Sequence, residues 1–121
     1  MQINLEKQEQ HAVQAYSSTQ IQINSVLYES SLIVSSTKII SDVAIRDIEL
    51  INEDYMSLVL SLKPELIIIG HKNTGKFPPI KLIAELSQKG IGIECMELGA
   101  ACRTYNVLIG EHRLVVAGFV F

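Results

Sequence analysis

The chain has 121 residues, of which 48% are hydrophobic and 19% charged, and its 10 basic and 13 acidic residues leave a formal net charge of −3. This length and composition predict one globular domain that can build its core without disulfides or a structural metal. The acidic balance argues against a nucleic-acid binder, which needs a basic surface to displace counterions from phosphates.

The N-terminal residues are polar and rich in Gln and Glu, without the apolar stretch of a signal peptide or the Arg-rich pattern of a transit peptide. We therefore expect a cytoplasmic protein with a flexible segment at residues 1–10 and a single α/β domain at residues 11–121. The apolar run Leu66–Ile69 is far shorter than the roughly 20 residues that span a bilayer, so membrane insertion is not expected.

Residues 11–36 alternate between apolar and polar side chains, which is typical of short strands. Asn24-Ser25 separates two of these runs and fits a two-residue hairpin loop, because Asn tolerates a positive φ. The segment therefore predicts an antiparallel meander. Ile39 and Ile40, and then residues 43–51, fit either a strand or an irregular connection.

A helix is predicted to begin after Asn52, a good N-cap, and to end before Pro64. Its apolar face would comprise Tyr55, Leu58, Val59 and Leu62. The next run, Leu66–Ile69, lacks alternation and indicates a strand that is covered on both faces and ends at Gly70.

A second helix is predicted to start at Pro79, with a stripe formed by Ile80, Ile83 and Leu86, and to end at Gly90. The strand at residues 91–96 completes a strand, helix, strand unit, whose two strands should be parallel and joined by a right-handed crossover. Local pattern leaves two alternatives open: a helix at about residues 100–109, or a strand at residues 107–109 that forms a hairpin with the buried strand at residues 114–121.

The loop that begins at Gly70 nearly matches a phosphate-binding P-loop over residues 70–77. Phe77 stands where Mg²⁺ needs a hydroxyl, and Pro78 and Pro79 remove backbone donors, so nucleotide hydrolysis is not expected. A weaker interpretation is a basic loop that receives an anion, and the alternative is a solvated turn.

Ligands of open α/β sheets bind outside the carboxyl ends of the strands. The segments after both predicted parallel strands leave at that edge, so we predict a ligand-binding site there. The candidate residues are Gly70, His71, Lys76, Glu97 and Arg103. Arg103 could clamp a carboxylate or phosphate with its planar fork, or instead pair with Glu94 or Glu97.

Cys102 is the one weak candidate for a catalytic residue, because a helix N-terminus and Arg103 could lower the pKa of its thiol. Its spacing from Cys95 matches neither a redox motif nor a zinc site, and the three histidines are scattered along the chain. We therefore expect neither a metal nor a cofactor.

The run Gly99–Leu108 resembles a motif of a family of small domains of unknown function, which includes mitochondrial complex I assembly factor 3 and the adipogenesis-associated domain protein. The resemblance extends to Tyr28–Leu32, Leu66–Gly70, Phe77-Pro78-Pro79 and Ile91–Met96. It implies an α/β domain with a central mixed sheet, an N-terminal antiparallel part and helices on the sheet, with a helix at residues 100–109. The family typically has Gly-Thr-Gly after the strand, where this chain has Gly70-His71-Lys72.

Three functions follow as hypotheses. The first, implied by the resemblance, is a non-enzymatic, assembly-factor-like domain that binds another protein. The second is a small-anion or small-molecule binding domain with a site at the carboxyl edge of the parallel strands. The third is a thiol enzyme that uses Cys102. A homo-oligomer is left open.

Overall fold

The structure is a computed structural model that describes residues 10–121 of the chain. The flexible segment expected at residues 1–10 lies outside the described residues except for Gln10, whose side-chain amide donates a hydrogen bond to the carbonyl of Ile109. The described part is an α/β domain with two sheets and three α-helices, as the sequence predicts.

The N-terminal sheet has three antiparallel strands in the order β1-β2-β3. They are β1 (Val13–Tyr16), β2 (Ile21–Ile23) and β3 (Val26–Tyr28). Asn24 and Ser25 join β2 to β3 with φ values of 51° and 67°, which confirms the predicted two-residue hairpin. The meander is shorter than predicted, because the strand at residues 32–34 pairs in the larger sheet instead.

A mixed five-stranded sheet in the order β5-β4-β8-β6-β7 forms the centre of the domain. It comprises β4 (Leu32–Val34), β5 (Ile39–Ile40), β6 (Leu66–His71), β7 (Gly92–Glu97) and β8 (Val115–Val120). β6 lies between β7 and β8 and is parallel to both, whereas β4 is antiparallel to β8. The predicted parallel unit of β6 and β7 is therefore confirmed.

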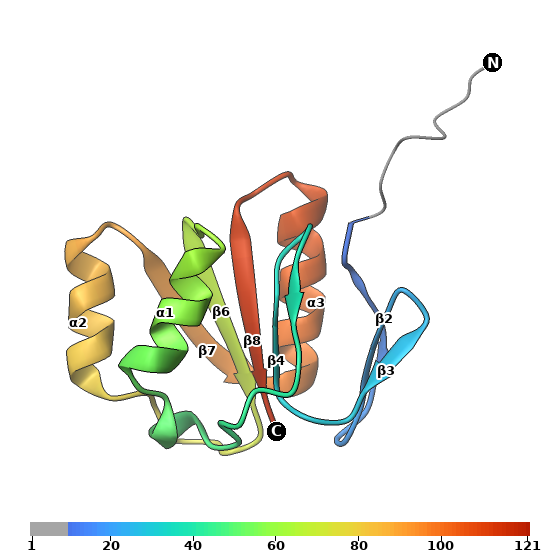
Figure 1. Cartoon of the computed structure of the whole chain (residues 1–121), viewed down its shortest axis with the longest axis horizontal. Coiled ribbons are helices and arrows are strands. Elements are labelled where there is room, and N and C mark those ends of the chain that lie inside the picture. Colours follow the sequence, from blue (N-terminus) through green and yellow to red (C-terminus); the bar gives the residue numbers. More distant parts are fainter. Residues whose placement is uncertain (1–9) are drawn as a thin grey trace.

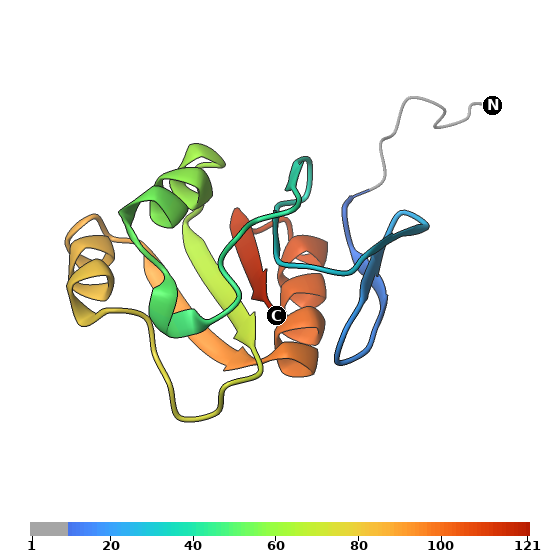
Figure 2. The same cartoon turned by 60° about the horizontal axis from the view of Figure 1, so that its bottom comes forward.

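Helices cover both faces of this sheet (Figure 1). They are α1 (Glu53–Ser61) and α2 (Ile80–Gln88) on one face and α3 (Leu98–Gly110) on the other, and a short 3-10 helix, η1 (Ile48–Leu50), precedes α1. The three-stranded sheet lies beyond α3 in both views (Figures 1 and 2). All residues of β8 and nearly all of β6 are buried, as strands covered on both faces should be.

The capping of α1 follows the prediction, since the Asn52 side chain accepts a hydrogen bond from the amide of Tyr55. The buried faces of the two helices, however, differ from the predicted stripes. Met56, not Leu58, accompanies Tyr55 in the core of α1. In α2 the buried residues are Leu82 and Leu86, and Ile80 is exposed because it stands at the first helical position beside the loop.

α3 confirms the helix that the family resemblance implies at residues 100–109, so the alternative strand there is wrong. Its outer side holds β1 through polar contacts. The side-chain amide of Asn106 accepts from the backbone N–H of Val13 and donates to the Val13 carbonyl, each at 2.8 Å. The Tyr105 hydroxyl donates to the carbonyl of His11 at 2.8 Å. The helix thus positions the small sheet.

Candidate functional site

A hollow of about 190 Å³ lies at the carboxyl edge of β6 and β7. It is lined by His71, Thr74, Gly75, Lys76, Phe77, Cys95, Met96 and Glu97. β6 and β7 end side by side, with His71 paired to Glu97 in register, and the loop from β6 to α2 contributes Lys76. The structure thus brings together His71, Lys76 and Glu97 as predicted, whereas Gly70 and Arg103 do not line this hollow.

Gly70 serves the packing of α3 against β6. A Cβ at this position would lie 2.6 Å from the Cβ of Ala101 and 3.1 Å from the ring of Phe119, so only glycine lets the helix approach this closely. The glycine that the sequence analysis assigned to the site is therefore a contact of the core.

His71 is 6% exposed and its ring is held by the adjacent turn. Its Nδ1 accepts a hydrogen bond from the backbone N–H of Asn73 at 3.1 Å, so the neutral ring carries its proton on Nε2. Burial lowers the pKa of His71 and outweighs the opposite effect of Asp47. The ring is therefore neutral at neutral pH and offers the hollow a hydrogen-bond donor rather than a cation.

The two other predicted residues of the hollow already have charged or polar partners. The Lys76 ammonium lies 3.4 Å from the Glu49 carboxylate. The Glu97 carboxylate caps α3, accepting from the backbone N–H groups of Gly99 at 2.9 Å and Ala100 at 3.1 Å. These two bonds lower the pKa of Glu97. Its carboxylate thus occupies the helix N-terminus, where an external anion would otherwise bind.

Arg103 lies on α3 and points to the small sheet, where its guanidinium donates to the Tyr16 hydroxyl. A second hollow, of about 200 Å³, lies on that side of Glu97. It is lined by Tyr16, Ser17, Ser18, Lys72, Glu97, Leu98 and Gly99. The Lys72 ammonium donates to the carbonyl of Ser18 at 3.0 Å. Arg103 and Lys72 therefore both hydrogen-bond to the small sheet or its connecting loop and hold it against the rest of the domain.

The thiols have raised pKa values. Cys102 is buried in the core between α3 and the sheets, and burial with the nearby Glu97 charge raises its pKa to about 12, although Arg103 acts in the opposite direction. The expected lowering of the Cys102 pKa is wrong, because desolvation outweighs the guanidinium. Cys95 lines the first hollow, and burial raises its pKa to about 11. Cys95 was not among the predicted site residues, although strand alternation places it on the same face as Ile93.

Exposed apolar residues lie on the loop that lines the first hollow and on the elements beside that loop, and they were not among the predicted site residues. Phe77 is 66% exposed, Ile80 84% and Leu50 63%. The ion pair between Glu49 and Lys76 brings η1 next to the loop, and Leu50 and Phe77 each directly follow one of its partners. Figure 2 shows this loop extending beyond the ends of the strands. Phe77 follows polar residues and precedes two prolines, which is a signal that it lies outside regular structure.

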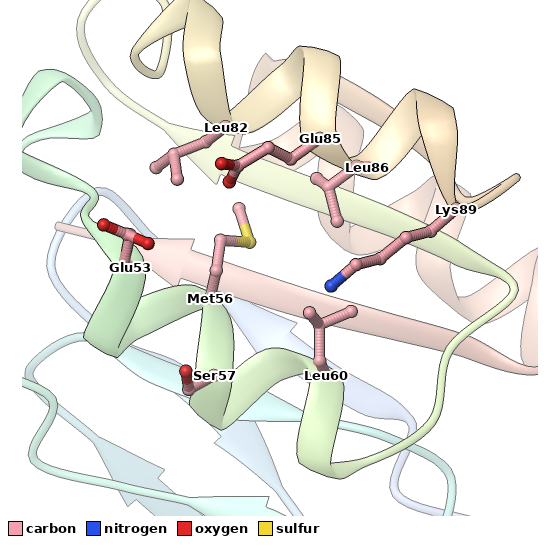
Figure 3. A pocket seen from close by; sticks show the side chains of 8 residues that line it. All are labelled: Glu53, Met56, Ser57, Leu60, Leu82, Glu85, Leu86 and Lys89. Carbon is pink, nitrogen blue, oxygen red and sulfur yellow. The ribbon is translucent and has the colours of Figure 1, made fainter.

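A groove lies between α1 and α2 (Figure 3). It is lined by Glu53, Met56, Ser57, Leu60, Leu82, Glu85, Leu86 and Lys89. The Glu53 and Glu85 carboxylates face each other near one end, and the Lys89 side chain extends toward Leu60 at the other. Its volume of about 100 Å³ is well below that of usual ligand pockets, so it suits one side chain of a partner at most.

Within residues 10–121, His, Cys, Asp and Glu side chains form no group of three or more that could hold a metal ion. Across the same residues, none of the helices has the length and apolar character needed to cross a membrane.

Residues 13–120 match a family described as "Protein of unknown function (DUF498/DUF598)". The chain is 34% identical over 89 residues to the "13 kDa major membrane protein" of Francisella tularensis subsp. holarctica, and the match covers 73% of this chain and 72% of that protein. It is 28% identical over 72 residues to the NADH dehydrogenase [ubiquinone] 1 alpha subcomplex assembly factor 3 of Xenopus tropicalis. That match covers 58% of this chain but only 39% of the frog protein.

The fold is shared with solved structures. The NMR structure of a Xanthomonas campestris protein superposes with a TM-score of 0.81 at 28% sequence identity, covering 90% of this chain and 83% of that one. The predicted family resemblance and the predicted fold class are thus confirmed.

Proposed function

Because this chain belongs to the DUF498/DUF598 family of proteins of unknown function, and because Phe77 and Ile80 expose apolar side chains on the loop and helix start that follow β6, we propose that it acts by binding another protein there. The observation that carries the proposal is the exposure of Phe77, which lines the hollow, and of Ile80, three residues further on at the start of α2. Large apolar side chains at the centre of an interface supply much of its binding free energy. The assembly-factor relative supports the same class of function.

The groups that could react each have a structural task, which favours binding over catalysis. The Glu97 carboxylate caps α3, Nδ1 of His71 accepts a backbone hydrogen bond, and burial keeps the Cys102 thiol protonated at neutral pH. A general base or nucleophile needs a lone pair that is free and a pKa near the working pH. The raised pKa of Cys102 therefore argues against a thiol enzyme that uses this residue.

The test compares capture of partners from the native cells by the unchanged protein and by a Phe77→Ser/Ile80→Ser variant. We expect the variant to capture at least about tenfold less of a specific partner than the unchanged protein does, because two apolar side chains of the interface are removed. Val107→Ser is the matched control, since Val107 is also exposed but lies on α3. Equal capture by the two variants, with both folded by circular dichroism, would contradict a binding surface at this edge.

The cytoplasmic location is likewise a proposal, and a relative is named as a membrane protein. Fractionation of native cells followed by immunoblotting tests it. We expect the chain in the cytosolic fraction, and recovery with the membranes after a high-salt wash would contradict the location.

A second candidate function is binding of a small anion in the first hollow, which is favoured by the position of the His71 ring and the Lys76 ammonium on its walls. Inorganic phosphate and phosphorylated sugars are the probes, and thermal unfolding is the measurement. A ligand at 100 times its Kd should stabilise the fold by about 2.7 kcal/mol. The effect should disappear in Lys76→Ala, and no shift with any probe would contradict this candidate.

A further inference from the structure

β7 forms one edge of the five-stranded sheet, and its outer backbone groups have no strand beside them within residues 10–121. The backbone N–H of Gly92 donates to the Glu65 carbonyl at the start of β6. Because successive residues of a strand direct their backbone groups to opposite sides, Glu94 and Met96 also pair with β6. Ile93 and Cys95 therefore direct their N–H and C=O groups outward.

The residues of β7 are more exposed than those of the strand beside it. None of the six residues of β7 is buried, whereas β6 beside it is almost entirely buried. Near its carboxyl end, the hollow lies between the strand and residues 74–77 of the loop, so the loop leaves space there. The strand also lacks proline, lysine and a bulge, which are three of the features that protect an edge from pairing, and its charged residues are the carboxylates of Glu94 and Glu97.

The side chains of β7 define what kind of strand would fit. Ile93 and Cys95 are half-buried on the face of α1 and α2, and Glu94 is exposed on the face of α3. The strand carries two carboxylates, of Glu94 and Glu97, and no basic side chain. An added strand would be favoured by apolar residues opposite Ile93 and Cys95 and by a basic residue opposite Glu94.

The charges also disfavour a second copy of this chain. In the antiparallel pairing centred on Glu94, the two Glu94 side chains would be directly opposite, and in the one centred on Cys95 they would be diagonal neighbours about 7–8 Å apart. Like charges at these positions destabilise a strand pair.

We propose that the free edge of β7 binds an extended segment of a partner protein, with alternating basic and apolar residues, as an additional strand of the sheet. The inference rests on the proposed function and specifies how the partner binds. Main-chain hydrogen bonds to Ile93 and Cys95 supply affinity, and Glu94 selects a basic residue. Phe77 and Ile80, at the adjoining loop and helix start, contact the partner beyond the strand.

The probe is an eight-residue peptide of alternating lysine and valine, acetylated and amidated, which is titrated into the isotope-labelled full chain. We expect the amide protons of Ile93 and Cys95 to shift and to exchange more slowly with solvent when the peptide is bound, because they become hydrogen-bonded. Glu94→Lys should weaken binding about tenfold or more. The matched control, Glu111→Lys, makes the same charge change at an exposed site beyond α3 and should leave the affinity within about twofold.

Two control peptides separate strand addition from charge attraction alone. One carries N-methyl groups on a central lysine and the valine beside it, which blocks both edges of the peptide, and the other replaces lysine by glutamate. Equal binding of either control, or no binding of the parent peptide, would overturn the inference. Concentration-dependent protection of Ile93 and Cys95 without peptide would also overturn it, because a second copy would then occupy the edge.

The inference and the proposed function fail in different ways. If the native partner is lost by Phe77→Ser/Ile80→Ser but retained by Glu94→Lys, the binding surface holds and strand addition is wrong. If the native partner is retained by the Phe77 and Ile80 variant, the proposed function itself is wrong.

Discussion

Gly70 and Phe77 are seven residues apart in the sequence, yet they lie in opposite environments. At Gly70, α3 lies so close that a single Cβ would meet Ala101 at 2.6 Å. At Phe77, two thirds of a large apolar side chain is exposed. The contact between β6 and α3 is therefore tightly packed, whereas the loop after β6 leaves apolar surface exposed, and this exposed surface is where we propose that a partner binds.

The largest expected effect is at the seam. Gly70→Ala should lower the free energy of unfolding by about 3 kcal/mol, because the Cβ of Ala101 is fixed to its helix and α3 must move. Urea unfolding followed by circular dichroism measures the change. An unchanged transition midpoint would show that the seam is looser than the contacts indicate.

A second tight contact lies on the opposite face of the sheet. Gly118→Ala should lower the free energy of unfolding by about 2 kcal/mol, since its Cβ would overlap the Tyr55 hydroxyl. The same urea titration checks it. In the Tyr55→Phe background the effect should shrink to below about 1 kcal/mol, and equal losses in both backgrounds would exclude the hydroxyl as the cause.

Tyr55→Phe alone should leave the protein as stable or raise the free energy of unfolding by up to about 1 kcal/mol. The Tyr55 hydroxyl is buried and has no hydrogen-bond partner among the described residues, so its desolvation is not compensated. Burial accordingly raises the pKa of Tyr55. Thermal unfolding measures the change, and a clear loss of stability would indicate that a bound water satisfies the hydroxyl.

Glu97 joins the two regions, and its effect depends on pH. Its pKa is lowered by the backbone donors of α3, so the charged carboxylate stabilises the fold above its ordinary pKa of 4.5. That stabilisation is lost as the pH falls through the lowered value. Glu97→Gln should therefore be less stable than the unchanged chain at pH 7, and the difference should vanish in acid. A difference that is constant across urea titrations from pH 7 to acid would contradict this account.

The smallest effect on stability belongs to the loop. Phe77→Ser should change the free energy of unfolding by less than about 0.5 kcal/mol, because the ring is largely exposed. Thermal unfolding of this variant beside Gly70→Ala tests the comparison directly. A loss similar to that of Gly70→Ala would show that Phe77 packs into the fold after all.

The regular elements could be predicted because their signals are local. Asn52, Gly90 and the uninterrupted run Leu66–Ile69 each fix a helix end or a strand through neighbouring residues. Alternation identifies a strand at residues 32–34 but not its partner, so it predicts this strand in the meander, whereas the structure has it in the larger sheet. The 3.6-residue period places Ile80 in the core because it does not show where the first turn meets the loop, and Ile80 is exposed.

The location of the candidate site at the carboxyl edge could be predicted, but the contacts that its residues make could be predicted only in part. Parallel strands bring His71 and Glu97 to one edge, and that follows from topology alone. The direction of Arg103 toward Tyr16 and the closeness of Gly70 to Ala101 depend on distances between elements that no local pattern encodes.

The position of β8 has a consequence for synthesis of the protein. This strand pairs with both β4 and β6, so these two strands cannot become part of one sheet until residues 115–120 have left the ribosome. The small sheet likewise cannot pack against the domain before Asn106 is synthesised, because the side-chain amide of Asn106 holds β1. Folding of the domain is therefore expected to occur after translation of almost all of these 121 residues rather than stepwise along the emerging chain.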